Sequence, residues 1–135
     1  MSDLILFDTS IFVDLLRTGR HQARIESVNG LIRTSSVVLA ELWRGATKLN
    51  EKNFLHALEK NHPVLAPTSQ NWLESGQLLS RLNQGHGFLA QKLRDLHFDV
   101  LIALTARAHG ARLITSNRSD FELIASVRPV ELEFW

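Results

Sequence analysis

The stretch 96–123 constrains the fold of this 135-residue chain more than any other segment. It begins with an amphipathic segment that predicts a helix, with Asp99 near the start of that helix. His109-Gly110 ends the helix, because Gly readily adopts the left-handed conformation that follows many helix C-termini. The apolar run 113–115 then predicts a strand, and the polar residues 116–121 predict a turn that opens the next helix. This order is typical of an α/β crossover unit, in which functional groups gather beyond the carboxyl ends of the strands.

The rest of the chain alternates between apolar runs of strand length and segments with helical spacing. Residues 4–7 form a continuous apolar run, which is typical of a strand buried on both faces of a sheet. Residues 130–134 alternate between apolar and charged side chains, as an edge strand does. Further strands are expected at 31–34 and 64–65. Helices are expected at 11–16 (capped by Thr9 or Ser10), 20–29, 37–46 (capped by Ser35 or Ser36) and 51–61. A last helix is expected from the Thr68-Ser69 cap to a corner at 85–87, and a short helix or ordered loop over 88–94 follows it.

The composition describes one compact α/β domain over residues 1–135. Apolar residues make up 44% of the chain, and no long polar tract suggests a linker. A net charge of +1 argues against a uniformly basic surface but leaves room for a local basic groove. Without cysteine the chain has no disulfide, thiol nucleophile or cysteine-bound zinc, which fits a cytoplasmic location. The sequence predicts neither a signal peptide nor a membrane span.

Four carboxylates occupy comparable places in this pattern. Asp8 follows the first strand and Glu41 lies on the helix after the second strand. Asp99 lies on the crossover helix and Asp120 just beyond the strand after it. In a parallel sheet these positions can converge at one edge, where four acids raise one another's pKa unless cations enter. Mg²⁺ and Mn²⁺ prefer such oxygen ligands together with substrate phosphate, so the pattern indicates metal-dependent phosphodiester hydrolysis.

Two of these four acids, Asp8 and Glu41, also have an interpretation without catalysis. Asp8 is equally well placed to be a helix N-cap. Glu41, taken alone, is better explained by an ion pair with Arg44 or Lys48 on an exposed helix face. Two neighbouring acids are expected in structural roles, Asp14 in a solvated pair with Arg17 and Asp95 as a helix cap. The six histidines show no metal-ligand spacing, so none is expected to take part in the site.

Three segments resemble the three acidic motifs of PIN-domain nucleases, and above all those of VapC-like toxins from toxin–antitoxin pairs: LILFDTSIFVDLLR, SSVVLAELWRGA and FDVLIALTARAHGARLITSNRSDFELI. The resemblance covers nearly the whole chain in the right order, and its third motif is the most specific. It implies a three-layer sandwich with a mostly parallel sheet between helices, and a homodimer. It further implies a Mg²⁺- or Mn²⁺-dependent endoribonuclease, neutralised by an antitoxin. The residues implied are Asp8, Glu41, Asp99 and Asp120 as catalytic metal ligands, with Ser10, Thr115 and Asn117 as supporting polar residues.

Two other functions remain open. An inactive PIN-like domain could bind RNA or protein, although a binding module has no reason to retain four mutually repelling acids. Asp8 could be the nucleophile of a phosphoryl-transfer enzyme, but such enzymes commonly carry a second acid two residues later, where this chain has Ser10. There is no P-loop, dinucleotide motif or nucleophile elbow.

Two surfaces are expected beside the acidic site. Because phosphate contacts dominate nucleic-acid affinity, cations near the motifs are expected to surround the acids, although each one alone is more simply an ordinary surface charge. This basic collar is formed by Arg17, Arg44, Lys48, Lys92 and Arg94. Large apolar side chains are expected to form a surface for a second subunit or an antitoxin helix, namely Trp43, Trp72, Leu78 and Leu79.

Overall fold

A central sheet of parallel strands organises the structure, a computed structural model that describes residues 3–135. Met1 and Ser2, which the sequence assigns to the domain, lie outside the described residues. Within the described chain the sheet has five strands in the order β3-β2-β1-β4-β5, and every neighbouring pair is parallel. The strands are β1 (Leu4–Phe7), β2 (Leu31–Ser35), β3 (Val64–Leu65), β4 (Arg112–Thr115) and β5 (Leu132–Phe134).

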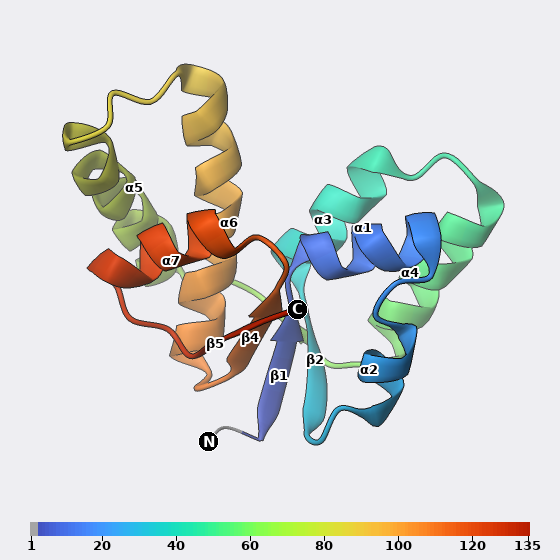
Figure 1. Cartoon of the computed structure of the whole chain (residues 1–135). Helices are drawn as coiled ribbons and strands as arrows, with labels where there is room; N and C mark the ends of the chain where they lie inside the picture. Colours follow the sequence, from blue (N-terminus) through green and yellow to red (C-terminus); the bar gives the residue numbers. More distant parts are fainter. Residues whose placement is uncertain (1–2) are drawn as a thin grey trace.

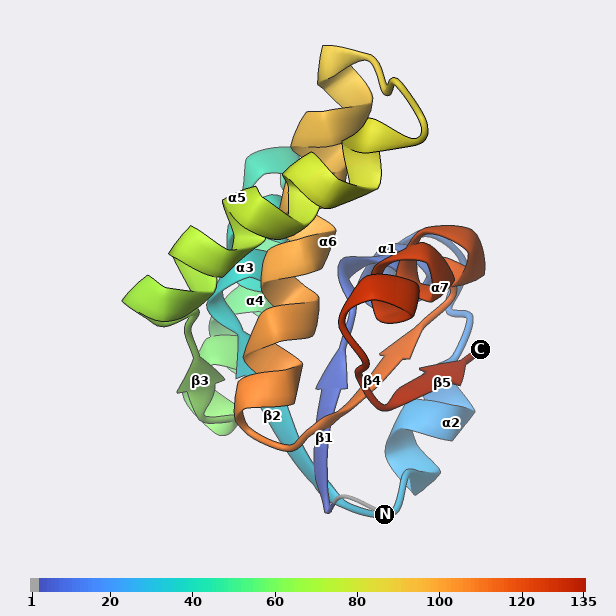
Figure 2. The same ribbon diagram turned by 90° about the vertical axis from the view of Figure 1, so that its left-hand side faces the viewer.

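Helices cover both faces of this sheet, as Figures 1 and 2 show. One face carries α5 (Ser69–Gln84), α6 (Ala90–Ala108) and α7 (Arg118–Val127). The other side carries α1 (Thr9–Thr18), α2 (Gln22–Ser27), α3 (Ser36–Gly45) and α4 (Leu49–Asn61). The predicted three-layer α/β fold with a parallel sheet is therefore confirmed.

The core lies between β1, β4 and the helices that follow them. Leu6 and Ile114 are fully buried, as expected for strands covered on both faces. Ile102 of α6 and Phe121 of α7 are also fully buried. Burial of these large side chains supplies the main driving force for holding the helices against the sheet.

The helix α6 differs from the prediction. Instead of a short helix or loop followed by a helix that starts near Asp99, residues 90–108 form one continuous helix. No Gly or Pro interrupts these residues, so nothing in the sequence stops the helix. Asp99 therefore lies in the middle of α6. Asp95 lies inside the same helix, where its Oδ1 accepts a hydrogen bond from Gln91 Nε2 at 3.1 Å, and the prediction that it caps a helix is wrong.

The predicted partner surface is only partly exposed. Leu78 is buried in the core and Leu79 is half-buried, because α5 packs this face against α6. Trp43 is half-buried and its ring contacts His56. Trp72 is 52% exposed and its neighbour Leu73 is 68% exposed. The exposed apolar surface on α5 thus centres on Trp72 and Leu73 rather than on the four predicted residues.

Among residues 3–135, no helix is both long and apolar enough to cross a bilayer.

Gly30 sets the start of β2 and gives a test of the fold. Its φ is +153°, and a Cβ at this position would lie 2.6 Å from Ile5 Cδ1 and 2.7 Å from the Asp3 carbonyl oxygen. The next amide, Leu31 N–H, donates to that same carbonyl at 2.6 Å. We expect Gly30→Ala to lower the free energy of unfolding by about 1–3 kcal/mol, because backbone and side chain must both move.

Urea denaturation measures this change. Gly85→Ala is the matched control, since nothing lies within 4 Å of a Cβ there and no left-handed φ is required. Equal stability of the two variants would show that the connection from α2 to β2 tolerates a side chain.

Candidate active site

Asp8 lies at the carboxyl end of β1, and its interpretation as a helix N-cap is confirmed. It is the N-cap of α1, with φ −66° and ψ 158°, and its side chain accepts from the Ser10 amide. It is also only 2% exposed. The helix begins at Thr9, so the cap is Asp8 itself rather than the predicted Thr9 or Ser10. A capping carboxylate is stabilised by the positive end of the helix, which offsets part of the cost of burying it.

Two hydroxyl groups hold one oxygen of the Asp8 carboxylate. Ser10 Oγ and Thr115 Oγ1 each donate to Oδ2 at 2.8 Å. The Asp8 N–H donates to the Ile114 carbonyl at 2.8 Å, so the β1–β4 pairing itself brings Thr115 to Asp8. Oδ1, by contrast, is buried and has no hydrogen-bond partner among the described residues. Burial raises the pKa of Asp8, and the Ser10 and Thr115 hydrogen bonds offset part of that increase.

Glu41 comes from α3 and is held by α1. Thr9 Oγ1 donates to Glu41 Oε1 at 2.7 Å. Burial raises the pKa of Glu41, the Thr9 hydrogen bond lowers it, and the nearby charge of Asp8 raises it further. Within the described part of the chain Glu41 has no ion pair shorter than 4.0 Å, so the predicted pair with Arg44 or Lys48 is wrong. The guanidinium of Arg44 lies over the Phe98 ring instead, 5.2 Å from its centre.

Asp99 shows that the four acids share one electrostatic environment. Burial raises the pKa of its carboxyl group to about 8, with further increases from the charges of Asp8, Glu41 and Asp120. Lys92 acts in the opposite direction. The four acids come from four different elements, and such mutual effects require them to lie near one another at the same end of the sheet.

Asp120 lies in the first turn of α7 and has a cationic partner. Lys92 Nζ lies 2.8 Å from Oδ1 and 2.9 Å from Oδ2. Asn117 Nδ2 donates to Oδ2 at 3.2 Å, and the Asn117 N–H donates to Thr115 Oγ1 at 2.9 Å. Asn117 therefore connects the Asp120 side of the site to Thr115, which itself holds Asp8.

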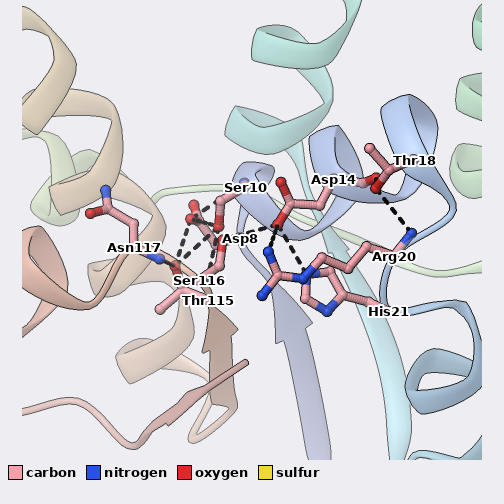
Figure 3. Close-up of polar contacts among 9 residues, drawn as sticks. All are labelled: Asp8, Ser10, Asp14, Thr18, Arg20, His21, Thr115, Ser116 and Asn117. Atoms are coloured by element: carbon pink, nitrogen blue, oxygen red, sulfur yellow. Dashed lines mark hydrogen bonds and ion pairs between the residues drawn. The ribbon is translucent and has the colours of Figure 1, made fainter.

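A second polar cluster adjoins Asp8 on the side of α1, as Figure 3 shows. The Ser116 N–H donates to Ser10 Oγ at 3.1 Å, and Ser116 Oγ donates to Asp14 Oδ2 at 3.4 Å. The same Asp14 oxygen lies 3.0 Å from His21 Nε2. Hydrogen bonds thus run from His21 to the Asp8 carboxylate.

This cluster corrects two predictions. Asp14 does not pair with Arg17, because Gly19 ends α1 with φ +74° and turns the chain back, which brings Arg20 to 4.0 Å and His21 to 3.0 Å from Asp14. His21, expected to have no part in the site, has a side chain that is only 3% exposed and contributes to this network. Residue spacing gives no signal for such a contact, since it depends on the geometry of the turn.

The predicted basic collar takes varied positions. Arg17 lines a pocket that also contains Thr9 and Glu41. Arg44 and Arg94 line a second, larger pocket with Trp72 and Phe98. Lys92 is bound to Asp120, while the side chain of Lys48 is exposed and its N–H donates to Glu51 Oε1 at 2.9 Å. Arg17 thus shares a pocket with Glu41, Arg44 acts on the pKa of Glu41, and Lys92 pairs with Asp120, while the role of the collar in RNA binding stays a prediction.

The donor set suits a hard divalent cation. Within residues 3–135 no three His, Asp or Glu side chains form a ready-made ligand shell. Mg²⁺ does not require one, because it retains several waters and needs only one or two carboxylates plus substrate phosphates. Asp8 Oδ1 offers a buried oxygen without a hydrogen bond, and Asp99 and Glu41 carry charge that a cation would stabilise.

The raised pKa of Asp99 predicts how the metal-free protein responds to pH. A carboxyl whose folded-state pKa lies above its ordinary value of 3.8 stabilises the fold at low pH, and this contribution is lost as the pH rises towards about 8. Asp8 and Glu41 act in the same direction. In the presence of a chelator, Tm should therefore fall between about pH 5 and about pH 8.

Thermal melts across this pH range test the assignment. Asp99→Asn should flatten the decline and melt higher than the wild type at the upper end. Glu59→Gln, at an exposed position on α4, should keep the wild-type decline. If all three proteins decline equally, Asp99 is not the repelled group.

The comparisons with known proteins agree with this architecture. Three solved structures match nearly the full chain. VapBC2 from Rickettsia felis bound to a promoter DNA fragment has a TM-score of 0.75, 24% identity and 98% of each chain covered, and DNA-bound VapBC from Salmonella typhimurium has a TM-score of 0.73, 20% identity and 99% of each chain covered. A toxin–antitoxin complex from Klebsiella pneumoniae has a TM-score of 0.63 and 26% identity, with 94% of this chain and 98% of that chain covered. No curated protein matches by sequence. A PIN domain family model matches residues 5–126. Because that match spans most of the chain, the chain belongs to the PIN domain family.

Proposed function

We propose that the chain is a divalent-metal-dependent endoribonuclease and the toxin of a toxin–antitoxin pair. The observation that carries the proposal is the acidic cluster, in which Asp99 is repelled by Asp8, Glu41 and Asp120. A cluster of this kind is costly to the fold, and its charge suits a bound cation and a phosphodiester substrate. Membership of the PIN domain family supports a nuclease, and the toxin–antitoxin complex from Klebsiella pneumoniae supports an antitoxin partner.

In this proposal Asp8, Glu41 and Asp99 hold Mg²⁺ or Mn²⁺. A bound divalent ion supplies polarisation of the scissile phosphate and activation of water. Ser10 and Thr115 occupy Oδ2 of Asp8 and so leave Oδ1 for the metal. Thr9 fixes the orientation of Glu41 in the same way. These hydrogen bonds hold the ligands in place before the substrate arrives, which lowers the cost of reorganisation during the reaction.

We further propose that the partners are RNA, a cognate antitoxin and a second copy of the chain. Trp72 and Leu73 are adjacent exposed apolar residues on α5 that suit a protein partner, since contiguous exposed apolar patches often mark interaction sites. The alternative function, an inactive PIN-like module that binds RNA or protein, would retain partner binding without cleavage. Cleavage by the wild type separates the two.

Replacement of the proposed ligands should abolish cleavage. Asp8→Asn and Asp99→Asn keep the side-chain shape, and Asn is a good N-cap, so both variants should fold. We expect RNA cleavage to fall by orders of magnitude and the rise in Tm caused by Mn²⁺ to disappear, because the ion then binds the folded state more weakly. Cleavage mapping of total cellular RNA after brief expression measures activity, and thermal melts measure the metal.

Glu59→Gln is the control for this experiment, since it removes an exposed carboxylate from α4, whereas the charge of Asp95 on α6 raises the pKa of Glu41. It should cleave like the wild type. Near-normal cleavage by both ligand variants, or wild-type cleavage that persists in a chelator, would refute the metal-dependent mechanism.

The basic collar predicts a salt dependence for RNA binding. Arg17→Ala and Arg44→Ala should each weaken binding of a non-cleavable RNA in Ca²⁺. Each should reduce the slope of log K against log salt by roughly 0.7, the value of one single-strand phosphate contact. Metal affinity should not change.

Arg107→Ala serves as the matched control, because Arg107 lies in the last turn of α6, at the opposite end of the sheet from the acids. Its slope should equal that of the wild type. If the Arg17 and Arg44 variants behave like this control, the RNA does not pass over this part of the surface.

A further inference from the structure

Lys92 and Asp120 form a bidentate ion pair inside the proposed active site. The ammonium group lies 2.8 Å from one carboxylate oxygen and 2.9 Å from the other, and joins the first turn of α6 to the first turn of α7. Asn117 Nδ2 adds a third hydrogen bond, to Oδ2, at 3.2 Å. Both oxygens of Asp120 therefore already have strong donors.

Asp8 and Asp120 are accordingly different kinds of acid. Asp8 has one oxygen that is buried and without a hydrogen-bond partner in the described chain. Asp120 has no such oxygen, and a metal ion could bind it only by displacing a charge-assisted bond from Lys92. The resemblance to PIN-domain nucleases implies the same metal-binding role for both acids, whereas their hydrogen-bond contacts in this chain differ.

The pair is more than a surface ion pair. The Asp120 side chain is 18% exposed, and that of Lys92 is 40% exposed. Asp120 and Lys92 act in opposite directions on the pKa of Asp99, so both lie within electrostatic reach of the acidic cluster. Lys92 is thus a cation of this chain that stands beside the acids.

We propose that Asp120 is not a metal ligand but a positioning residue for Lys92, and that the Lys92 ammonium group contacts a phosphate oxygen of the RNA beside a single bound metal ion. The proposal rests on the proposed nuclease function. An ammonium group has three N–H donors, of which two are used by the two oxygens of Asp120. The third donor and the partial exposure of Lys92 leave it free to reach an oxygen of the substrate.

The chemistry of such a contact is electrostatic. Negative charge develops on the phosphate oxygens during phosphodiester hydrolysis, and a fixed cation stabilises it most when it does not need to reorganise. A free lysine side chain has several rotatable bonds, but two charge-assisted bonds to Asp120 restrict it. Lys92 thereby supplies at one point the positive charge that a second metal ion supplies in two-metal sites.

Direct metal binding distinguishes the two acids without any measurement of activity. We expect calorimetric titration of the full chain with Mn²⁺ to give one ion per chain. Asp120→Asn should retain the wild-type Kd to within about threefold, whereas Asp99→Asn should weaken it by roughly tenfold or more, as loss of a ligand does. Two ions per wild-type chain, or a loss of affinity in Asp120→Asn equal to that in Asp99→Asn, would overturn the proposal.

Kinetics and RNA binding then test the role of Lys92. Lys92→Met should lower kcat and remove about one phosphate contact from the salt slope, and Lys92→Arg should restore part of both because it keeps the charge. Asp120→Asn should show the same defect, and the double variant should be no worse than Lys92→Met alone, since the two residues act as one unit. If Lys92→Met only lowers Tm and leaves kcat and the salt slope unchanged, the pair merely joins two helices.

A matched ion pair provides the control. Arg128 Nη2 and Glu74 Oε1, 2.8 Å apart, also join two helices, but at the other end of α7. Arg128→Met should change stability without changing kcat, the salt slope or Mn²⁺ binding. Failure of the nuclease function itself would look different, because the wild type would then neither bind Mn²⁺ nor cleave RNA.

Discussion

The buried carboxylate of Asp8 is the constraint on which the rest of the site depends. Burying an acid at the end of a central strand is costly, and hydrogen bonds to the carboxylate reduce that cost. The parallel pairing of β1 with β4 supplies Thr115, and the first turn of α1 supplies Ser10. Residues more than a hundred positions apart therefore meet because of strand register, and among the described residues one oxygen of Asp8 is left without a hydrogen-bond partner.

The other acids add electrostatic repulsion that the residues around the site only partly offset. Each of Asp8, Glu41 and Asp99 has a raised pKa, which means that the ionised site opposes folding near neutral pH. Hydrogen bonds from hydroxyl groups reduce this cost, and Lys92 reduces it further at Asp99. The ionised site therefore lowers the stability of the fold near neutral pH, and a bound cation would offset this cost.

Local signals in the sequence predict much of this structure. Patterns within a few residues of one another predict the strand at 4–7 and the helix caps at Ser35 and Thr68. The four acidic positions stand out in the same way, next to predicted strands and helices. The Asp14–His21 contact does not, because it depends on a left-handed turn at Gly19, and neither does the burial of Leu78, because helical spacing alone does not say which face of α5 meets α6. The expected break before Asp99 is absent from α6, since no residue there breaks a helix.

The Lys92–Asp120 pair is the least predictable part of the site and also the least constrained. Asp8 and Thr115 are fixed by the sheet, and Glu41 is held by the neighbouring helix through Thr9. Lys92, in contrast, lies in the first turn of α6, where Leu89 provides no side-chain cap, after an exposed corner. Its position therefore depends on Asp120 as much as that of Asp120 depends on it. Removal of either charge should therefore release the other side chain of the pair, whereas the buried Asp8 carboxylate cannot move without disturbing β1 and α1.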